Sequence, residues 1–295
     1  MLMETRSQTS PDSAYLTASP QNLSEVDFRR LALFIEGELG IRMPDTKRIM
    51  LESRLQKRLR RLGIANFGAY VDFVFSGKGG ETELINMIDA VTTNKTDFFR
   101  EADHFEYLTD TIVPAAAKDG SGVSRPFLLW SAGCSTGEEP YTIAMVLEER
   151  RLLEPRFDYR IFASDLSTQV LDKAREAVYE ESRVEIVPLT FKKRYMLKSK
   201  DKESGLVRMK PAIRARVSFE RVNFMDDAYP VAKALDVVFC RNVIIYFERR
   251  VQESILRKLC AHIRPGGWLF LGHSETLTGM DLPLRGVAPT IYARV

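Results

Sequence analysis

The sequence predicts an α/β protein with a doubly wound parallel sheet, preceded by a small all-α unit. Two patterns lead to this prediction. Helical periodicity alone fills residues 24–91, and apolar strand-like runs alternate with amphipathic segments after Pro126. The chain has 295 residues, of which 45% are hydrophobic and 28% charged, which suits two globular domains. No run of about 18 apolar residues occurs, so we expect no membrane insertion.

The first 23 residues are rich in Ser, Thr, Gln and Pro. They lack the cationic start and apolar core of a signal peptide, so we expect a disordered tail at 1–23. The three cysteines have no CxxC spacing, and His104, His262 and His273 form no cluster in the sequence. We therefore expect no metal, and the odd cysteine count favours a reducing cytoplasm.

Four helices are expected in the all-α unit, at residues 24–40, 45–63, 66–75 and 81–91. Ser24 and the pair Asp45-Thr46 have the residue types of N-caps, and Gly40 and Gly63 those of helix ends. The second helix is basic: residues 42–61 contain eight Lys or Arg and two acids. Spacing places Lys47, Arg54, Arg58 and Arg61 on one face beside a leucine stripe.

This basic helix has more than one interpretation. A solvated helix face explains a charge run by itself. Basic and apolar faces together would also suit nucleic acid, an anionic membrane or an acidic protein helix. The interleaved aromatic residues that single-stranded nucleic acid favours are absent from the helix.

The second domain alternates strands with helices. Strands are expected at 127–130, 159–163, 217–222, 235–240, 268–271 and 290–293, and helices at 138–150, 167–178 and 248–263. The Lys/Arg-rich segment at about 184–219 interrupts this alternation, and an inserted β-hairpin with one strand at 205–209 explains it best.

A glycine-rich loop, Gly133–Gly137, follows the first of these strands and leads into Glu138-Glu139. Loops of this kind usually serve phosphate, which these two carboxylates would repel. The loop therefore suits a polar or cationic ligand, such as the sulfonium and amino group of S-adenosylmethionine.

Three more features fall at the carboxyl ends of strands, where open α/β sheets bind ligands. Asp165 can accept hydrogen bonds from ribose hydroxyls, although a helix cap or turn is the commoner role at such a position. Asn223 and Phe224 offer an amide and an aromatic face for adenine. The run from Cys240 to Phe247 follows the next strand.

Gly133-Cys134-Ser135-Thr136-Gly137 also matches the G-x-S-x-G elbow of serine hydrolases, with Asp236 and His273 in the right chain order. Against this interpretation, the loop follows the first strand, and Glu138 and Glu139 would destabilise an oxyanion. We expect His273 to be a structural turn residue.

The linker at about 92–110 carries a polar run and the pair Phe98-Phe99 between the two domains. It is expected to line the active-site cleft, or to be a capped linker whose two rings plug the domain interface. Both interpretations are compatible.

Several blocks together resemble the chemotaxis receptor glutamate methyltransferases, the CheR family. The resemblance runs from about Ser24 to the C-terminus and rests on segments 92–101, 130–141, 162–165, 240–247 and 272–275. It implies an all-α domain at 24–91 and an S-adenosylmethionine-dependent methyltransferase domain at 111–295 with a β-subdomain insertion. Family cofactor contacts would fall on Asn94, Thr96, Arg100, Glu139, Asp165, Asn223, Phe224, Asn242 and Val243.

The resemblance also implies roles in recognising receptors. Arg100 and Tyr246 would lie nearest the transferred methyl group, and the basic helix, through Arg54, Lys57, Arg58 and Arg61, would dock on acidic receptor helices. Some members grip a receptor's C-terminal pentapeptide with the inserted hairpin. The tip here, residues 198–205, lacks the glycine pair of peptide-binding members.

The proposed reaction, methylation of a carboxylate, needs no catalytic base from the protein. A glutamate side chain has a pKa of about 4.3, so it is ionised at neutral pH and attacks without a general base. No convincing catalytic His or Cys dyad occurs in the sequence, which favours carboxyl methylation. The alternatives are a nucleic-acid methyltransferase of the same fold, the serine hydrolase, and a member that binds cofactor or receptor without turnover.

Overall fold

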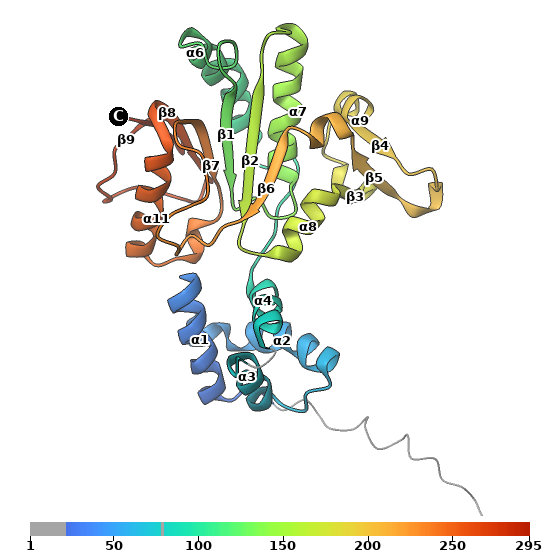
Figure 1. Ribbon diagram of the computed structural model, residues 1–295, viewed down its shortest axis with the longest axis vertical. Coiled ribbons are helices and arrows are strands. Elements are labelled where there is room, and N and C mark those ends of the chain that lie inside the picture. Colours follow the sequence, from blue (N-terminus) through green and yellow to red (C-terminus); the bar gives the residue numbers. More distant parts are fainter. Residues whose placement is uncertain (1–21, 78–79) are drawn as a thin grey trace, which may run out of the picture. The chain divides into compact units, whose positions relative to one another are not determined.

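A computed structural model describes residues 22–77 and 80–295, which form two compact units (Figure 1). The first contains the described residues up to Leu33 and Met43–Ala90, and the second contains Phe34–Arg42 and Val91–Val295. Most of the expected tail lies outside the described residues. Leu23, at its end, is buried, and its backbone N–H donates to Glu52 at 2.9 Å. Among the helices of residues 22–77 and 80–295, none is long and apolar enough to cross a membrane.

Four α-helices lie where the periodicity predicts them. They are α1 (Glu25–Leu39), α2 (Arg48–Leu62), α3 (Phe67–Phe75) and α4 (Gly80–Val91). The prediction that Asp45-Thr46 caps α2 is wrong, because Asp45–Lys47 forms a separate 3₁₀ turn (η2) and no side chain caps α2. Gly63 ends α2 with φ +66°, and Asn66 caps α3 by accepting from the Ala69 N–H at 2.9 Å.

The second unit is built on a seven-stranded sheet in the order β6-β2-β1-β7-β8-β10-β9 (Figure 1). Its strands are β1 (Phe127–Ala132), β2 (Tyr159–Asp165), β6 (Val217–Arg221), β7 (Leu235–Cys240), β8 (Ile263–Leu271), β9 (Leu284–Ala288) and β10 (Ile291–Arg294). The first five in sheet order pair in parallel, and β10 runs antiparallel to β8 and β9. The doubly wound α/β fold is confirmed.

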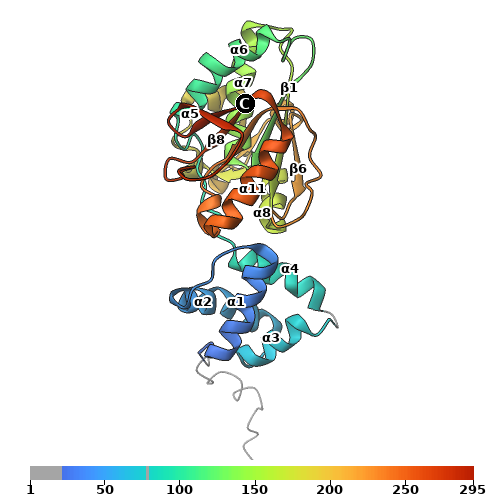
Figure 2. The same ribbon diagram turned by 90° about the vertical axis from the view of Figure 1, so that its left-hand side faces the viewer.

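Helices cover both faces of this sheet. Alternate residues of β1 belong to different buried clusters: Phe127 and Leu129 pack with α7 (Glu138–Leu153) and α8 (Thr168–Glu176), whereas Trp130 packs with α11 (Arg249–His262). Figure 2 shows α11 against the sheet. Because both faces are buried, the central strands read as continuous apolar runs.

Three elements of the second unit differ from the sequence-based expectation. The expected linker is helical from Asp103, through α5 (Asp103–Tyr107), the π-helical turn η3 (Leu108–Ile112) and α6 (Val113–Lys118). Strand β8 starts at Ile263, because its pairing with β7 shifts register and absorbs the Pro-Gly-Gly expected to form a turn. Strand β9 has no counterpart in the prediction.

The insertion contains more elements than the predicted hairpin. It contains a three-stranded antiparallel sheet in the order β3-β5-β4. Its elements are β3 (Val178–Glu180), η4 (Glu181–Val184), α9 (Leu189–Tyr195), β4 (Met196–Lys198), η5 (Lys202–Ser204), β5 (Leu206–Met209) and α10 (Pro211–Arg214). We call residues 178–214 the β-subdomain. The prediction began it too late because β3 has three residues and follows α8 almost directly, and it ran on into β6, which belongs to the main sheet.

Candidate active site

The glycine-rich loop after β1 is a tight turn fixed by its neighbours. The N–H groups of Gly133 and Cys134 both donate to Ser164 O at 2.8 Å, which ties the loop to β2. Gly133 has φ +87°, and a Cβ there would lie 2.4 Å from Val243 Cγ2. Glycine is therefore required because the loops after β1 and β7 pack directly against each other.

Asp165, at the end of β2, organises two loops. Its Oδ2 accepts from the Ser135 N–H at 2.8 Å, and its Oδ1 accepts from the Ser167 N–H at 3.0 Å. The carboxylate is thus fixed at the carboxyl edge of the sheet, beside the turn of the glycine-rich loop. The turn-stabilising role considered for it is confirmed, and its expected contact with ribose stays a prediction.

Glu138 and Glu139 begin α7 and are engaged separately. Glu138, 1% exposed in its side chain, accepts from Thr136 Oγ1 at 2.6 Å and from Arg183 Nη2 at 2.8 Å. Glu139 accepts from Ser131 Oγ at 2.7 Å and lies 3.5 Å from Arg241 Nη1. Burial raises the pKa of Glu139, and the Arg241 charge opposes that shift.

The linker lies beside the glycine-rich loop. The Asn94 carbonyl accepts from Ser135 Oγ at 2.8 Å, and the Thr96 carbonyl accepts from Arg183 Nη2 at 2.5 Å. Arg100 Nη1 donates to Lys95 O at 3.3 Å. The structure therefore gathers Asn94, Thr96 and Arg100 on one segment next to the carboxyl edge.

Phe98 and Phe99 pack inside the second unit. The Phe98 ring meets Tyr179 edge to face at 5.0 Å, and the Phe99 ring meets Phe105 at 6.0 Å and Phe191 at 5.6 Å. The interpretation that the two rings plug a domain interface has to be corrected. Their partners come from α5 and the β-subdomain, which the sequence could not place beside the linker.

The loop after β7 carries three predicted site residues, and a single carboxylate holds it. Glu275 accepts from the N–H groups of Asn242, Val243 and Ile244, each at 2.9 Å, and from Gly272 at 2.6 Å. Asn242 has φ +59°. Tyr246 ends the 3₁₀ turn η6 (Ile244–Tyr246) and is half-buried.

Asn223 and Phe224 follow β6. Asn223 Nδ2 donates to Glu38 O at 2.8 Å, and its Oδ1 accepts from the Met225 N–H at 3.0 Å. The Phe224 ring is 9% exposed and lies 5.9 Å from the Tyr229 ring. Both side chains thus make contacts within the protein, and their expected contact with adenine stays a prediction.

Sequence reasoning assigned no role to Glu101, Arg241 or Glu275, which form the charged framework of this edge. Arg241, 2% exposed in its side chain, donates to Glu101 Oε2 at 3.1 Å and stacks over the Phe105 ring at 5.3 Å. A charged residue directly after the apolar run at 237–240 was the available signal. Glu101 and Glu275 gave no comparable signal, because each lies far along the sequence from Arg241 and from the loop that follows β7.

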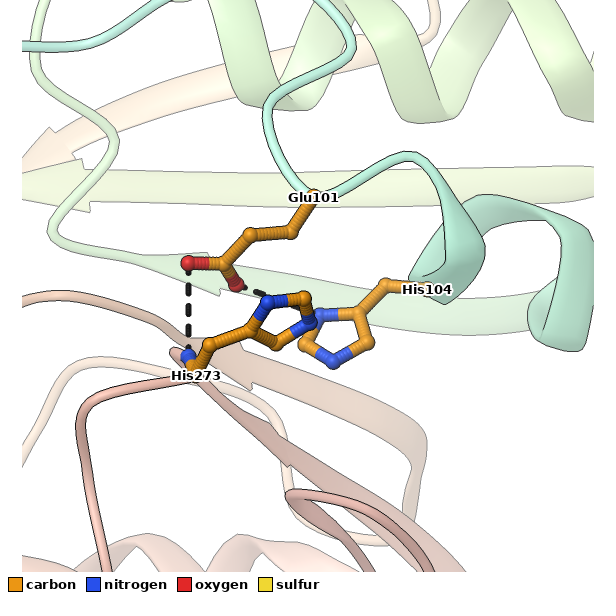
Figure 3. A group of neighbouring side chains, drawn as sticks. All are labelled: Glu101, His104 and His273. Carbon is orange, nitrogen blue, oxygen red and sulfur yellow. Dashed lines mark hydrogen bonds and ion pairs between the residues drawn. The ribbon is translucent and has the colours of Figure 1, made fainter.

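Figure 3 shows a side-chain cluster formed by Glu101, His104 and His273. Their potential ligand atoms lie within 4.8 Å of one another, and the two imidazole rings are 5.0 Å apart. The expectation that the histidines form no cluster is wrong for this pair, because α5 and the end of β8 meet in the fold. The Arg241 guanidinium occupies one oxygen of Glu101, and Asp103 lies 3.2 Å from His273 Nε2. These contacts explain the cluster as a hydrogen-bonded bridge between the linker and the loop after β8.

The serine hydrolase arrangement is not assembled. Ser135 Oγ donates to the Asn94 carbonyl, and His273 pairs with Asp103. Asp236 lies near the opposite end of β7, where Arg125 and Arg264 each bind it at 2.7 Å. Burial also raises the pKa of the Cys134 and Cys240 thiols well above the ordinary value, so neither is a thiolate nucleophile at neutral pH.

The comparisons with known proteins now identify the family. Residues 26–92 match the model of the CheR methyltransferase all-alpha domain, and residues 94–292 match that of the CheR methyltransferase SAM binding domain. The chain belongs to the CheR methyltransferase family. The chain is 39% identical over 274 residues to the chemotaxis protein methyltransferase of Escherichia coli, covering 92% of this chain and 91% of that one. The corresponding protein of Borreliella burgdorferi is 35% identical, covering 92% and 95%.

As a CheR-family enzyme, the chain is an S-adenosylmethionine-dependent methyltransferase. The donor set at its sheet edge fits that cofactor. Glu139 and Asp165 place carboxylates beside the glycine-rich loop, which repel phosphate and favour a ligand with a positive charge and hydroxyl groups. Bound there, the cofactor supplies an electrophilic methyl group.

The four expected docking residues of the basic helix α2, in the CheR all-α domain, differ in how far their side chains are exposed. Lys57 and Arg61 are exposed, and Arg54 is half-buried. Arg58 is 14% exposed in its side chain and donates to Glu83 at 2.9 and 2.5 Å, while the Tyr70 hydroxyl donates to the same carboxylate at 2.8 Å. Arg58 is therefore held within the helical unit by this network, and its expected part in docking stays a prediction.

Proposed function

We propose that this chain transfers methyl groups from S-adenosylmethionine to glutamate side chains in the cytoplasmic domains of chemoreceptors, forming methyl esters. The observation that carries the proposal is 35–39% identity over 92% of the chain with proteins named chemotaxis protein methyltransferase. Receptor adaptation would be the physiological role, and recruitment to receptor arrays would follow from it.

The chemistry required of the protein is positioning. A substrate glutamate is ionised at neutral pH, so the protein needs no general base to activate it. It must hold the carboxylate oxygen in line with the methyl carbon at about 3 Å, a task that contributes roughly 7–11 kcal/mol at best. The buried thiols and the engaged histidines at the sheet edge agree with this requirement.

We assign the orientation of the incoming carboxylate to Arg100 and Tyr246. Arg100 is half-buried on the linker, and Tyr246 is half-buried at the end of η6. A tight two-point pair with Arg100 would stabilise the ground-state anion and slow its attack, so a looser contact serves the reaction better. Asp165 would bind the ribose, and Glu139 the ammonium group or a ribose hydroxyl. Asn94, Thr96, Asn223, Phe224, Asn242 and Val243 would complete the cofactor contacts.

Receptor helices would dock on basic side chains of α2. Arg54, Lys57 and Arg61 supply this surface, which suits the acidic methylation region of a receptor. A receptor's C-terminal peptide could add to the β-subdomain beside its edge strand β4, the usual mode by which a sheet captures an extended segment.

One experiment tests the proposal directly. The full chain is incubated with methyl-labelled S-adenosylmethionine and a chemoreceptor cytoplasmic fragment, and the label is followed through mild base. Base-labile label on the fragment supports the proposal, and its loss when the methylatable glutamates are changed to alanine assigns the acceptor. Base-stable label, or label on added nucleic acid in place of the fragment, would overturn it.

A further inference from the structure

Two arginines from distant parts of the chain attach the linker to α7. Arg183 comes from η4 of the β-subdomain, and Arg241 comes from the end of β7. Each pairs with one of the adjacent glutamates that open α7 and also donates to a backbone carbonyl of the linker. The linker segment between those two carbonyls, Thr96–Arg100, is therefore held at both ends.

Arg183 makes three separate contacts. Its Nη2 donates to Glu138 Oε1 at 2.8 Å and to the Thr96 carbonyl at 2.5 Å, and its Nη1 donates to Asp97 Oδ1 at 3.0 Å. The hydrogen bond that Arg183 donates to Glu138 raises the pKa of Arg183, and burial opposes that shift. A planar guanidinium can bind two carboxylates and a carbonyl at once, which a lysine ammonium does with less directional control.

Arg241 repeats the arrangement at the other end of the segment. It donates to the Arg100 carbonyl and to Glu101, and it lies 3.5 Å from Glu139 Oε2. Phe99 and Glu101 have φ +53° and +56°, a backbone conformation that non-glycine residues adopt rarely. The surroundings must hold such a conformation, and the contacts of Arg241 do so at Arg100 and Glu101.

The side chains of Arg183 and Arg241 differ in their exposure to solvent. Arg241 is 2% exposed in its side chain, whereas Arg183 is 41% exposed. Its partner Glu138, however, is 1% exposed, so the loss of Arg183 would leave a buried carboxylate that still accepts from the Thr136 hydroxyl but has lost its charged donor. The β-subdomain thereby contributes a side chain that fixes the start of the cofactor-binding linker.

We propose that Arg183 is a positioning residue for the cofactor site: it sets Thr96 and Asp97 against the first turn of α7 and thereby raises the affinity for cofactor. The proposal rests on the proposed assignment of Asn94, Thr96 and Arg100 to the cofactor site. It makes the β-subdomain part of the methyl-transfer machinery as well as a surface for partners.

The chain offers a matched control. Arg194, on α9 of the same subdomain, is 48% exposed and also pairs with a glutamate of α7, Glu149. Its hydrogen bonds go to Glu149, away from the linker. Arg183→Gln and Arg194→Gln each remove one ion pair between the subdomain and α7, and they differ in contact with the linker.

The test measures binding of S-adenosylhomocysteine to the full chain by calorimetry, with hydrogen exchange of residues 94–101 as a second readout. We expect Arg183→Gln to weaken binding about tenfold, the change expected for one lost charged hydrogen bond, and to speed exchange in the linker. Arg183→Lys should fall between Arg183→Gln and the parent, and Arg194→Gln should match the parent in both readouts. Glu138→Gln, which keeps the shape of the partner, should weaken binding in the same direction.

Equal affinity in Arg183→Gln and the parent would overturn the proposal, as would an equal loss in Arg194→Gln or linker exchange that stays at the parent rate. If Arg183→Gln fails to fold, Arg183→Lys and Glu138→Gln decide the outcome by the same two readouts. Because the ligand is the product nucleoside and no receptor is present, the result is independent of which protein the chain methylates.

Discussion

Glu275 holds Asn242 through its backbone: the carboxylate Oε2 accepts from the Asn242 N–H at 2.9 Å. The same carboxylate also accepts from the next two N–H groups along the loop and from Gly272. Burial raises the pKa of Glu275, and the backbone donors oppose that shift. One buried side chain thus determines the path of the loop that carries Asn242, Val243 and Tyr246.

Glu275→Gln should therefore disturb this loop. A glutamine has one acceptor oxygen and an NH₂ group that cannot accept, so at least one backbone N–H loses its partner. We expect a loss of about 1–3 kcal/mol in the free energy of unfolding and weaker cofactor binding. Chemical denaturation and calorimetry measure the two effects. Glu253→Gln, at an exposed pair on α11, is the control and should change neither. Unchanged binding in Glu275→Gln would show that the loop does not need this carboxylate.

Arg100→Ala tests the assigned orientation of the substrate carboxylate. Loss of a positioning group should reduce turnover by tens to hundreds-fold, judging by the effect of removing single transition-state donors. The measurement is the initial rate of receptor methylation at saturating cofactor. Lys95→Ala, at the exposed neighbour on the same linker, should keep most of the activity. Methylation by Arg100→Ala at the parent rate would remove Arg100 from the active site.

Asp165→Ala should weaken cofactor binding more than it slows turnover at saturation. The change removes the proposed ribose acceptor and also the two hydrogen bonds that hold the loops after β1 and β2. Calorimetry with S-adenosylhomocysteine measures the affinity. Asp172→Ala, an exposed aspartate on α8 paired with Arg175, is the comparison. Equal affinities in the two variants would contradict the assignment.

Substitutions in the basic helix α2 should have two different effects, one on receptor methylation and one on stability. The double change Lys57→Ala and Arg61→Ala should leave the fold intact and lower the rate of receptor methylation, with a deficit that shrinks at high salt. Arg58→Ala should instead destabilise the helical unit by about 3–5 kcal/mol, because it strands the buried Glu83 carboxylate. Thermal unfolding separates the two classes, and a stable, docking-defective Arg58→Ala would reverse our interpretation.

His104 predicts a pH dependence of stability. Burial and the nearby Arg241 charge lower the pKa of His104 to about 4. The unfolded chain, with an ordinary imidazole pKa of about 6.5, binds the proton more readily between pH 6.5 and 4. Acidification through that window should therefore cost up to about 3 kcal/mol of unfolding free energy. His104→Gln should lose this part of the dependence and His273→Gln should keep it, measured by urea denaturation at several pH values. A profile unchanged in His104→Gln would contradict the prediction.

Much of the fold was predictable from local pattern. The strands from Phe127, Tyr159 and Leu235 and the helices around them follow from apolar runs and periodicity, because both faces of the sheet are buried. Short elements were not predictable in the same way. Strand β3 has three residues, too few to show a period, and β8 passes through a Pro-Gly-Gly that reads as a turn.

The candidate site also has parts that the sequence predicts and parts that it does not. Residues at strand ends, such as Asp165 and Asn242, could be predicted as site residues because the carboxyl ends of parallel strands share one edge of a sheet. The residues that bind them could not be predicted. Glu275 lies 33 residues from Asn242, and Arg183 lies 45 residues from Glu138, so no spacing along the chain relates them.

By itself, the sequence determined the α/β architecture, the family and the edge of the sheet at which the chemistry belongs, because these depend on periodicity and on motifs contiguous in the chain. Only the tertiary structure decided how charges are paired: that Arg58 binds Glu83 within the helical unit, and that Arg183 and Arg241 hold the linker. Ion pairs form between atoms a few ångströms apart, and that proximity is set by folding, not by position along the chain.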